Sequence, residues 1–158
     1  MNSIVITSKA SISSLSHQPE QIWQRYLSDT CYLNICCFNN EDTPSGRLHP
    51  ETLKLIDQIR KENSNYRRLD KTVLMAILAS RICIENSDWE NLEEVGINIG
   101  SSRGATQLFE KYHSHFLNSP NQKISPLTSP TTTLGNIASW VSNDLSSDSI
   151  NLSHSITC

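Results

Sequence analysis

Apolar and polar positions along the chain follow two periods, one typical of helices and the other of strands. Apolar residues spaced three and four apart predict amphipathic helices that begin at Pro19 and Pro50, since proline is favoured in a first helical turn. Residues 73–79 are all apolar within a predicted helix at 70–85, which indicates a helix buried in the interior. Two further helices are predicted, one after Gly104 and one over residues 134–145. The apolar faces of the amphipathic helices are expected to consist of Ile22, Trp23, Tyr26, Leu27, Leu53, Leu55, Ile56, Ile59, Leu108, Phe109, Tyr112, Phe116, Ile137, Val141 and Leu145.

Shorter apolar stretches predict strands at residues 3–8, 31–38, 95–99 and 150–157. The segment 39–47 contains Pro44 and Gly46 and is predicted to be a loop. Residues 118–133 contain three prolines and are predicted to run extended, because proline disfavours the helical conformation in the residue before it. Strands that alternate with helices predict an α/β layered fold.

Composition and charge narrow the class of protein. With 158 residues the chain is long enough for one domain with a sizeable core. A formal net charge of −3 provides no general attraction for nucleic acid or for an anionic membrane, so neither is expected as a partner. No apolar stretch is long enough to span a bilayer, and the first residues lack the basic region of a signal peptide. Together with an odd number of cysteines, five, these features predict a cytoplasmic protein with free thiols.

The turn that contains Gly96, Gly100 and Gly104 follows a predicted strand and precedes a predicted helix. It lacks the Gly-Lys-Ser/Thr sequence of a phosphate-binding P-loop, and its spacing differs from the dinucleotide-binding fingerprint. We therefore expect a tight strand-to-helix connection.

The cysteines and histidines do not have the spacing of a metal site. Cys31, Cys36 and Cys37 cluster, but no second pair of ligands lies at a zinc-like spacing. His113 and His115 are two residues apart on a predicted helix and would point to different sides. We expect neither a metal nor a cofactor. Two further residues have simple interpretations: Cys83 as a small apolar residue of the buried helix, and His154 as a surface or interface histidine.

Cys158 is the last residue and directly follows the strand predicted at 150–157. A cysteine at the exit of a strand is a common position for a nucleophile, because the turn exposes the sulfur and a following helix stabilises the thiolate. We therefore interpret the chain as one that ends at the nucleophile of an active site.

Four segments of the chain resemble, in order and in spacing, the segments of one enzyme family. Tyr-Arg-Arg-Leu-Asp at 66–70 leads into an apolar helix, and Val-Gly-Ile-Asn-Ile-Gly-Ser-Ser-Arg-Gly at 95–104 resembles the strand and glycine turn of that family. Residues 123–130 with 136–138 resemble its proline-rich segment and following helix, and Ser-Ile-Thr-Cys at 155–158 resembles its nucleophile motif. The chain thus resembles the N-terminal portion of a β-ketoacyl synthase, with the C-terminal portion absent. The β-ketoacyl synthases are the condensing enzymes of the thiolase-like superfamily.

The resemblance implies a fold, a reaction and partners. The fold would be the N-terminal part of a thiolase-like layered fold, with a mixed sheet and a buried helix. Cys158 would accept an acyl group from an acyl carrier protein before condensation with malonyl-carrier protein, in fatty acid or polyketide biosynthesis. Arg67 and Arg68 would help to dock the acidic carrier, and Arg103 would lie at the entrance of the acyl pocket. Thr157 departs from the alanine that is usual in this family, and the family's assisting histidines lie further along than this chain extends.

Two other interpretations remain open. The chain could be a non-catalytic ketosynthase-like partner subunit or dimerisation module, although such partners usually lack the nucleophile. It could also be an unrelated α/β domain with a terminal cysteine. Whether the chain is part of an enzyme or of a non-catalytic partner subunit, a homodimer or heterodimer is expected. The 150–157 strand and the 134–145 helix would lie at its two-fold interface, because an edge strand with an apolar face is suited to pairing with the same strand of a second subunit.

Overall fold

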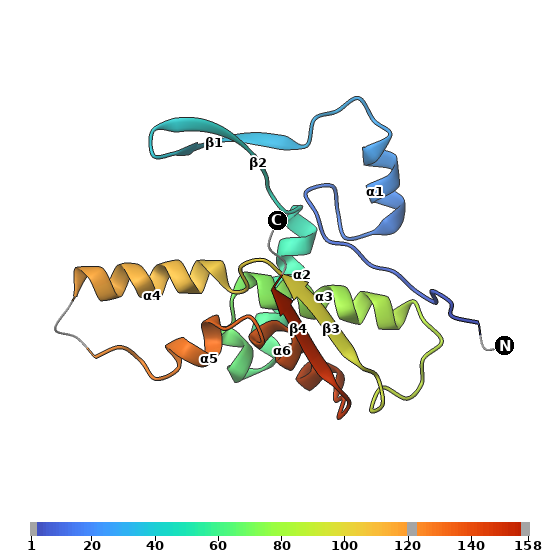
Figure 1. The fold of residues 1–158 in the computed structure, drawn as a ribbon. Helices are drawn as coiled ribbons and strands as arrows, with labels where there is room; N and C mark the ends of the chain where they lie inside the picture. Colours follow the sequence, from blue (N-terminus) through green and yellow to red (C-terminus); the bar gives the residue numbers. More distant parts are fainter. Residues whose placement is uncertain (1–2, 120–122, 156–158) are drawn as a thin grey trace.

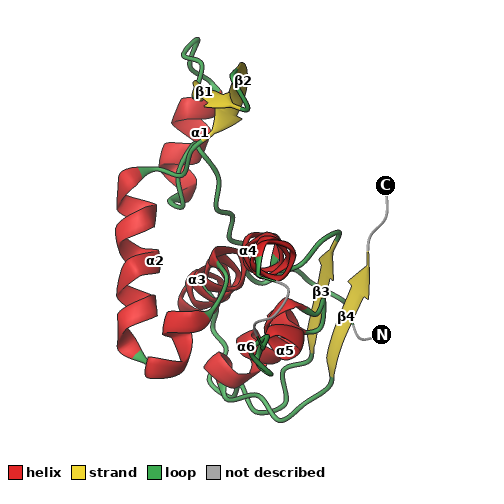
Figure 2. Cartoon of the chain, turned by 90° about the vertical axis from the view of Figure 1, so that its left-hand side faces the viewer, coloured by secondary structure: helices red, strands yellow, loops and turns green. Residues whose placement is uncertain are grey.

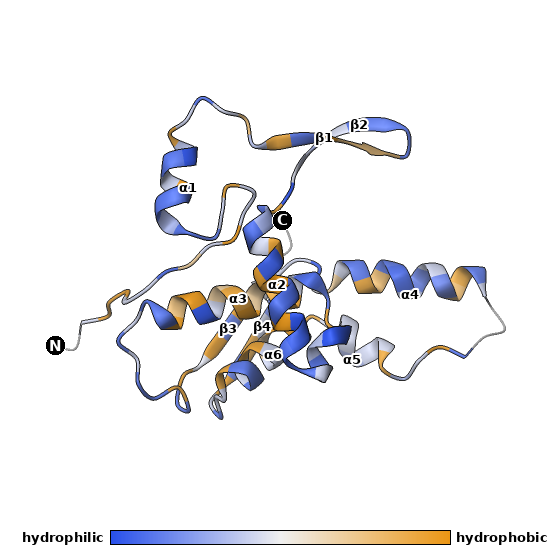
Figure 3. Cartoon of the chain, turned by 180° about the vertical axis from the view of Figure 1, so that it is seen from behind, coloured by the Kyte–Doolittle hydropathy of each residue, from blue (hydrophilic) through white to orange (hydrophobic). Residues whose placement is uncertain are grey.

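A buried helix, α3 (Lys71–Glu85), lies at the centre of the chain. Its first turn is capped by Asp70, whose Oδ1 accepts a hydrogen bond from the Thr72 amide at 2.8 Å. Val73, Leu74 and Ile77 are fully buried, so the prediction of an interior helix is confirmed. We describe residues 3–119 and 123–155 of a computed structural model (Figure 1). Figure 3 shows the apolar positions along α3.

The other core elements pack around α3 in layers. Figure 2 shows α2 (Pro50–Glu62), α3, α6 (Asn136–Leu145) and a two-stranded sheet in succession. A short 3-10 helix, η1 (Ser64–Arg68), connects α2 to α3. The helices predicted at Pro50, at 70–85 and at 134–145 are therefore confirmed. The core consists of Ile56, Ile59, Tyr66, Leu69, Val73, Leu74, Ile77, Leu78, Ile97, Ile137, Ala138 and Val141.

The described strands form two small sheets. β1 (Leu33–Phe38) and β2 (Glu41–Gly46) make an antiparallel hairpin, while β3 (Ile97–Ser101) and β4 (Asn151–Ser155) pair in parallel. The chain is thus a mixed α/β protein, as predicted. Among the described residues the antiparallel pair and the parallel pair form two separate sheets.

Three local predictions were wrong. Residues 3–8 form no strand, and Ile4 and Ile6 are exposed, because no neighbouring strand provides hydrogen bonds for this segment. The predicted loop at 39–47 contains β2, because Asn39 and Asn40 both adopt positive φ and reverse the chain in a tight hairpin turn. The predicted extended stretch at 118–133 contains α5 (Thr128–Thr132), in which Pro130 lies in the first turn and needs no amide partner.

Two helices exist as predicted but do not bury their apolar faces. α1 (Pro19–Tyr26) and α4 (Thr106–Asn118) contain no buried residue, and α4 extends away from the body of the chain in Figure 1. Phe109 and Phe116 of α4 are more than half exposed. Leu53 of α2 is also exposed, contrary to its predicted inward orientation. The apolar faces of these amphipathic helices are thus left largely uncovered by the part of the chain that the structure describes.

One buried carboxylate ties three elements together. The Asp144 carboxylate of α6 accepts hydrogen bonds from the Tyr66 hydroxyl at 2.7 Å and from Arg81 Nε and Nη2 at 2.9 and 2.7 Å. Arg81 also donates to Glu62 of α2 at 2.8 Å. Burial and the Asp144 acceptor raise the pKa of Tyr66 to about 12, and Asp144 holds the pKa of Arg81 above its ordinary value. We name Tyr66, Arg81 and Asp144 the Asp144 network.

The helices of residues 3–119 and 123–155 include none with the length and apolar character required to cross a lipid bilayer.

Candidate functional site

The parallel pairing of β3 and β4 brings two distant segments of the chain to one edge. In this register Gly100 lies opposite His154 and Ser101 lies opposite Ser155. Because the strands are parallel, their carboxyl ends meet at the same edge, as Figure 2 shows. The glycine turn follows β3 at this edge, and the segment that leads to Cys158 follows β4. Cys158 itself lies outside the described residues.

The glycine turn is the tight strand-to-helix connection that was predicted. Gly104 has a φ of +62°, a conformation that favours glycine, and its amide donates to Ser101 Oγ at 2.9 Å. A Cβ at this position would lie 3.3 Å from Leu134 Cδ2. Arg103 is exposed in this turn, close to the edge at which β4 ends. The turn thus places Arg103 two residues after Ser101, which pairs with Ser155 at the end of β4.

Asp70 joins the two helices that begin near this edge. Its Oδ2 accepts a hydrogen bond from the Leu108 amide of α4 at 2.9 Å, in addition to the cap on α3. The side chain is almost fully buried, so one carboxylate satisfies amides from two helix N-termini. A hollow of about 690 Å³ adjoins it, lined by residues that include Arg47, Lys71 and Gln107. From the sequence, Asp70 is recognisable only as a helix start.

Arg67 and Arg68 lie exposed in η1, and the structure adds a third arginine to them. Arg60, in the last turn of α2, donates from Nη1 to the Arg67 carbonyl at 3.3 Å and to the Leu69 carbonyl at 3.1 Å. Arg60 was not among the site residues predicted from the sequence. Its position beside Lys61 at the end of a predicted helix was the available signal. We call Arg60, Arg67 and Arg68 the arginine cluster.

The β3–β4 sheet has an open face, and β4 is exposed at every position, whereas Ile97 of β3 is buried in the core. Asn151 donates from Nδ2 to Ser142 Oγ of α6 at 3.0 Å, so this side of β4 faces the helices. Ile150, Leu152 and His154 have the opposite parity; Ile150 is 69% exposed and Leu152 is 47% exposed. The prediction of a half-buried strand is therefore wrong within this chain. The exposed position of His154 agrees with its prediction as a surface or interface histidine. Parallel sheets are normally covered on both faces.

The apolar side of α6 is used inside the chain. Ile137, Ala138 and Val141 are buried in the core against α3 and the sheet. Of the two elements expected at a subunit interface, β4 therefore has a free apolar face, whereas the apolar residues of α6 are already covered.

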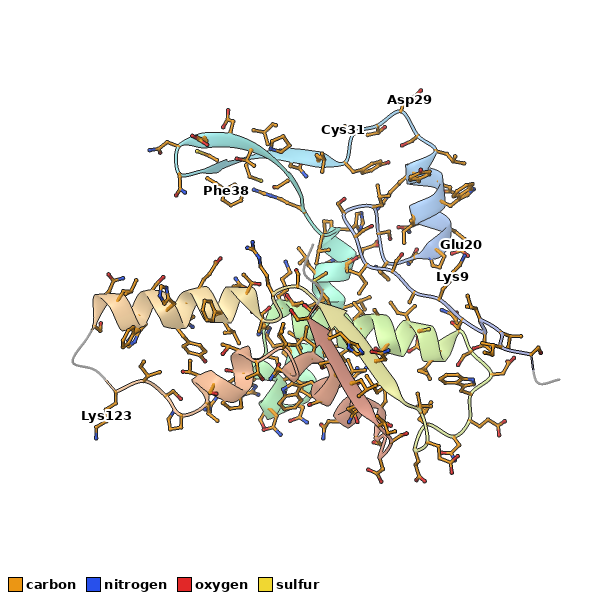
Figure 4. All side chains as sticks on the ribbon, viewed as in Figure 1. Lys9, Glu20, Asp29, Cys31, Phe38 and Lys123 are labelled. Carbon is orange, nitrogen blue, oxygen red and sulfur yellow. The ribbon has the colours of Figure 1, made fainter. Side chains whose placement is uncertain are left out.

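The cysteines of the hairpin region differ in environment. Cys36 is 8% exposed, and its sulfur accepts hydrogen bonds from Ser45 Oγ at 2.9 Å and Arg47 Nε at 3.3 Å. These two donors lower the pKa of the Cys36 thiol, with Ser45 contributing most. Cys31 and Cys37 are exposed; Figure 4 shows Cys31 and Phe38 towards opposite ends of β1. Among the residues that the structure describes, no group of three histidine, cysteine or acidic side chains could hold a metal ion.

No protein-family model matches the chain, and no curated protein matches it either.

Proposed function

We propose that the chain is the N-terminal portion of a β-ketoacyl-[acyl-carrier-protein] synthase and that Cys158 is its acyl-accepting nucleophile. The observation that carries this proposal is the parallel pairing of β3 with β4. It brings the glycine turn, which contains Arg103, and the end of β4, three residues before Cys158 in the sequence, to the same carboxyl edge of the sheet. In open α/β sheets this edge is where binding and catalytic sites form. The thiolase-like fold is part of the same proposal.

The proposed chemistry begins with acyl transfer. The Cys158 thiol first loses its proton, and the thiolate attacks the carbonyl of an acyl thioester. A new thioester forms on Cys158, the bond to the carrier sulfur breaks, and the carrier leaves as a thiolate that takes up a proton from solvent. Malonyl-carrier protein then loses carbon dioxide, and the resulting carbanion attacks the acyl-enzyme and releases Cys158. A reducing cytoplasm, the predicted location, suits a reaction that depends on a free thiol.

A second candidate function is that of a non-catalytic ketosynthase-like partner subunit. The open face of the sheet favours it, because Ile150, directly before β4, and Leu152 of the edge strand β4 are exposed and a second subunit would cover them. The presence of Cys158 favours the enzyme over the partner.

We expect Cys158 to react with iodoacetamide about tenfold faster than any other cysteine of the natural protein. Cys31 and Cys37 are exposed but lack a stabilising donor in the structure, and Cys36 has donors but is buried. Incubation with an acyl thioester should add one acyl group to Cys158, measured by intact mass and peptide mapping. In the 158-residue chain the preference should shrink, because the terminal carboxylate lies beside the thiol.

The matched controls are Cys158→Ala, which should lose acylation, and Cys36→Ala, which should keep it. Acylation that survives in Cys158→Ala, or equal alkylation of all five cysteines, would leave the partner subunit as the better proposal.

Reversing the charge of Arg67 and Arg68 is expected to weaken carrier-protein binding. The arginine cluster is the densest basic site on an acidic chain, and a carrier with an acidic surface would be attracted to it. In R67E/R68E the apparent KM for an acyl-carrier substrate should rise about tenfold at low salt and lose its salt dependence. With acyl-pantetheine, which lacks the carrier, KM should stay unchanged.

The control for net charge is K9E/K123E, in which two exposed lysines at opposite sides of the molecule are reversed (Figure 4). An equal rise of KM in this variant would mean that overall charge, and not the arginine cluster, attracts the carrier.

A further inference from the structure

Residues 3–47, which we call the N-terminal arm, have almost no core of their own. Within the arm, Ser16 and Cys36 are buried, whereas the buried apolar cluster of the core begins at Ile56. Figures 1 and 2 show α1 and the β1–β2 hairpin to one side of the part of the chain that contains α3. Burial of apolar area therefore contributes little to the stability of the arm. Its large apolar side chains are instead exposed: Ile4, Val5, Ile6, Trp23, Tyr26, Leu27, Leu33, Ile35 and Phe38.

Few contacts join the N-terminal arm to residues 48–119 and 123–155, which we call the body. Ile12 packs against the core. His17 Nδ1 lies 2.8 Å from Thr52 Oγ1 in the first turn of α2, and Arg25 Nη2 lies 3.1 Å from Nε2 of His49, the N-cap of α2. Among the described residues, these are the two hydrogen bonds between the arm and the body. Both bonds reach the same end of α2.

Arg25 also connects the parts of the N-terminal arm to one another. Its Nη1 donates to the Leu15 carbonyl, and its guanidinium carbon lies 5.8 Å from the centroid of the Tyr32 ring, directly before β1. The segment before α1, α1 itself and the start of the hairpin therefore share one side chain. A movement that breaks the contact of Arg25 with His49 would disturb all three.

The body, in contrast, is held by a continuous core. Val73, Leu74 and Ile77 have no exposed surface, and the Asp144 network joins α6 to η1 and α3. Between β2 and α2, residues 47–49 form neither helix nor strand, so the chain can bend there. Segments with few buried apolar contacts open at a lower free energy than a packed core.

We propose that the N-terminal arm opens as a unit from the body, about residues 47–49, while α2, α3 and α6 stay folded. The closed arm acts as a strap on α2, because His17 and Arg25 both bond at its N-terminal end. Opening breaks these two hydrogen bonds and removes Ile12 from the core. A two-stranded hairpin is only marginally stable alone, so β1 and β2 unfold in the open state. The opening is independent of the proposed acyl transfer.

Hydrogen exchange of the 158-residue chain in increasing concentrations of urea tests the opening. Amides of α1 and of the β1–β2 hairpin should exchange at urea concentrations at which the α3 amides remain protected. Thr52→Val keeps the shape of a fully buried side chain and removes the hydroxyl that contacts His17. In this variant the protection of α1 should fall about fivefold, the effect of one lost hydrogen bond, while the protection of α3 stays constant.

The matched control is Asp144→Ala, which acts on the body. It should lower the protection of α3 about a hundredfold and leave the protection of α1 unchanged, because the arm opens without the core. Equal protection of α1 and α3 throughout the urea series, or equal losses in both helices in either variant, would show that the chain unfolds as one unit and would overturn the proposal. Unchanged protection of α1 in Thr52→Val would also overturn it, since the bond to His17 would then not hold the arm.

Discussion

Replacing Asp144 with alanine should lower the free energy of unfolding by about 3 kcal/mol, because it leaves buried polar partners of the Asp144 network without their acceptor. The Asp144 side chain is only 2% exposed and accepts from two residues on different elements. The Tyr66 hydroxyl would then be buried without an acceptor, and Arg81 would keep Glu62 as its one carboxylate partner among the described residues. Urea denaturation followed by circular dichroism measures the change directly.

The control is Glu62→Gln, which removes the outer partner of Arg81. Glu62 is 47% exposed, so its loss should cost less than about 1 kcal/mol. Equal losses in Asp144→Ala and Glu62→Gln would contradict the importance assigned to the buried carboxylate.

The Asp144 network should also limit stability at alkaline pH. The pKa of Tyr66 is raised from 10.0 to about 12, so the folded state keeps this proton more tightly than the unfolded state. The stabilisation is complete below pH 10 and is lost as pH rises through 12. In Tyr66→Phe the stability curve between these pH values should be flatter than in the unaltered chain.

Replacing Asp70 with alanine should cost about 3 kcal/mol, because one substitution removes a helix cap and leaves a second amide without its acceptor. Its two oxygens accept from Thr72 and Leu108 on different helices, at 2.8 and 2.9 Å. The same substitution should loosen α4 relative to α3, and therefore the glycine turn between β3 and α4. Chemical denaturation measures the first effect, and hydrogen exchange at the start of α4 measures the second.

Asp70→Asn serves as the matched variant. Its single carbonyl oxygen can keep the Thr72 cap but cannot also accept from Leu108, so roughly half of the loss is expected. If Asp70→Asn and Asp70→Ala were equally destabilising, the Thr72 cap kept by asparagine would contribute nothing to stability. The assignment of two separate stabilising hydrogen bonds to Asp70 would then be wrong.

Local signals in the sequence predicted the helices well. Pro19, Pro50 and Asp70 mark helix starts through their own backbone and hydrogen-bonding chemistry, and all three helices begin there. Strands depend on partners that are distant in sequence. The apolar run at 3–8 therefore suggested a strand that has no partner, while the polar β2 forms because the Asn39–Asn40 turn folds it onto β1.

The candidate site was predictable only in part. Cys158, Arg67, Arg68 and Arg103 were selected from sequence motifs, which need no knowledge of the fold. The contacts of Arg60 with η1, of Asp70 with α4 and of Arg25 with His49 depend on how helices meet. No pattern within one segment contains that information. The open face of β4 likewise became visible only once the register with β3 was known.

The parallel pairing of β3 and β4 has a consequence for the order of folding. The Ser147 hydroxyl that bonds the Val95 carbonyl next to this pair comes from 52 residues later in the chain. Parallel strands so far apart carry a larger loop-closure entropy than the local hydrogen bonds of the helices, and they form slowly. During synthesis, α2 and α3 can form as soon as they emerge, whereas β3 must wait for β4. The edge that carries the glycine turn is therefore among the last parts of this chain to assemble, and until α6 and β4 have been synthesised the apolar side of β3 lacks the helix that covers it.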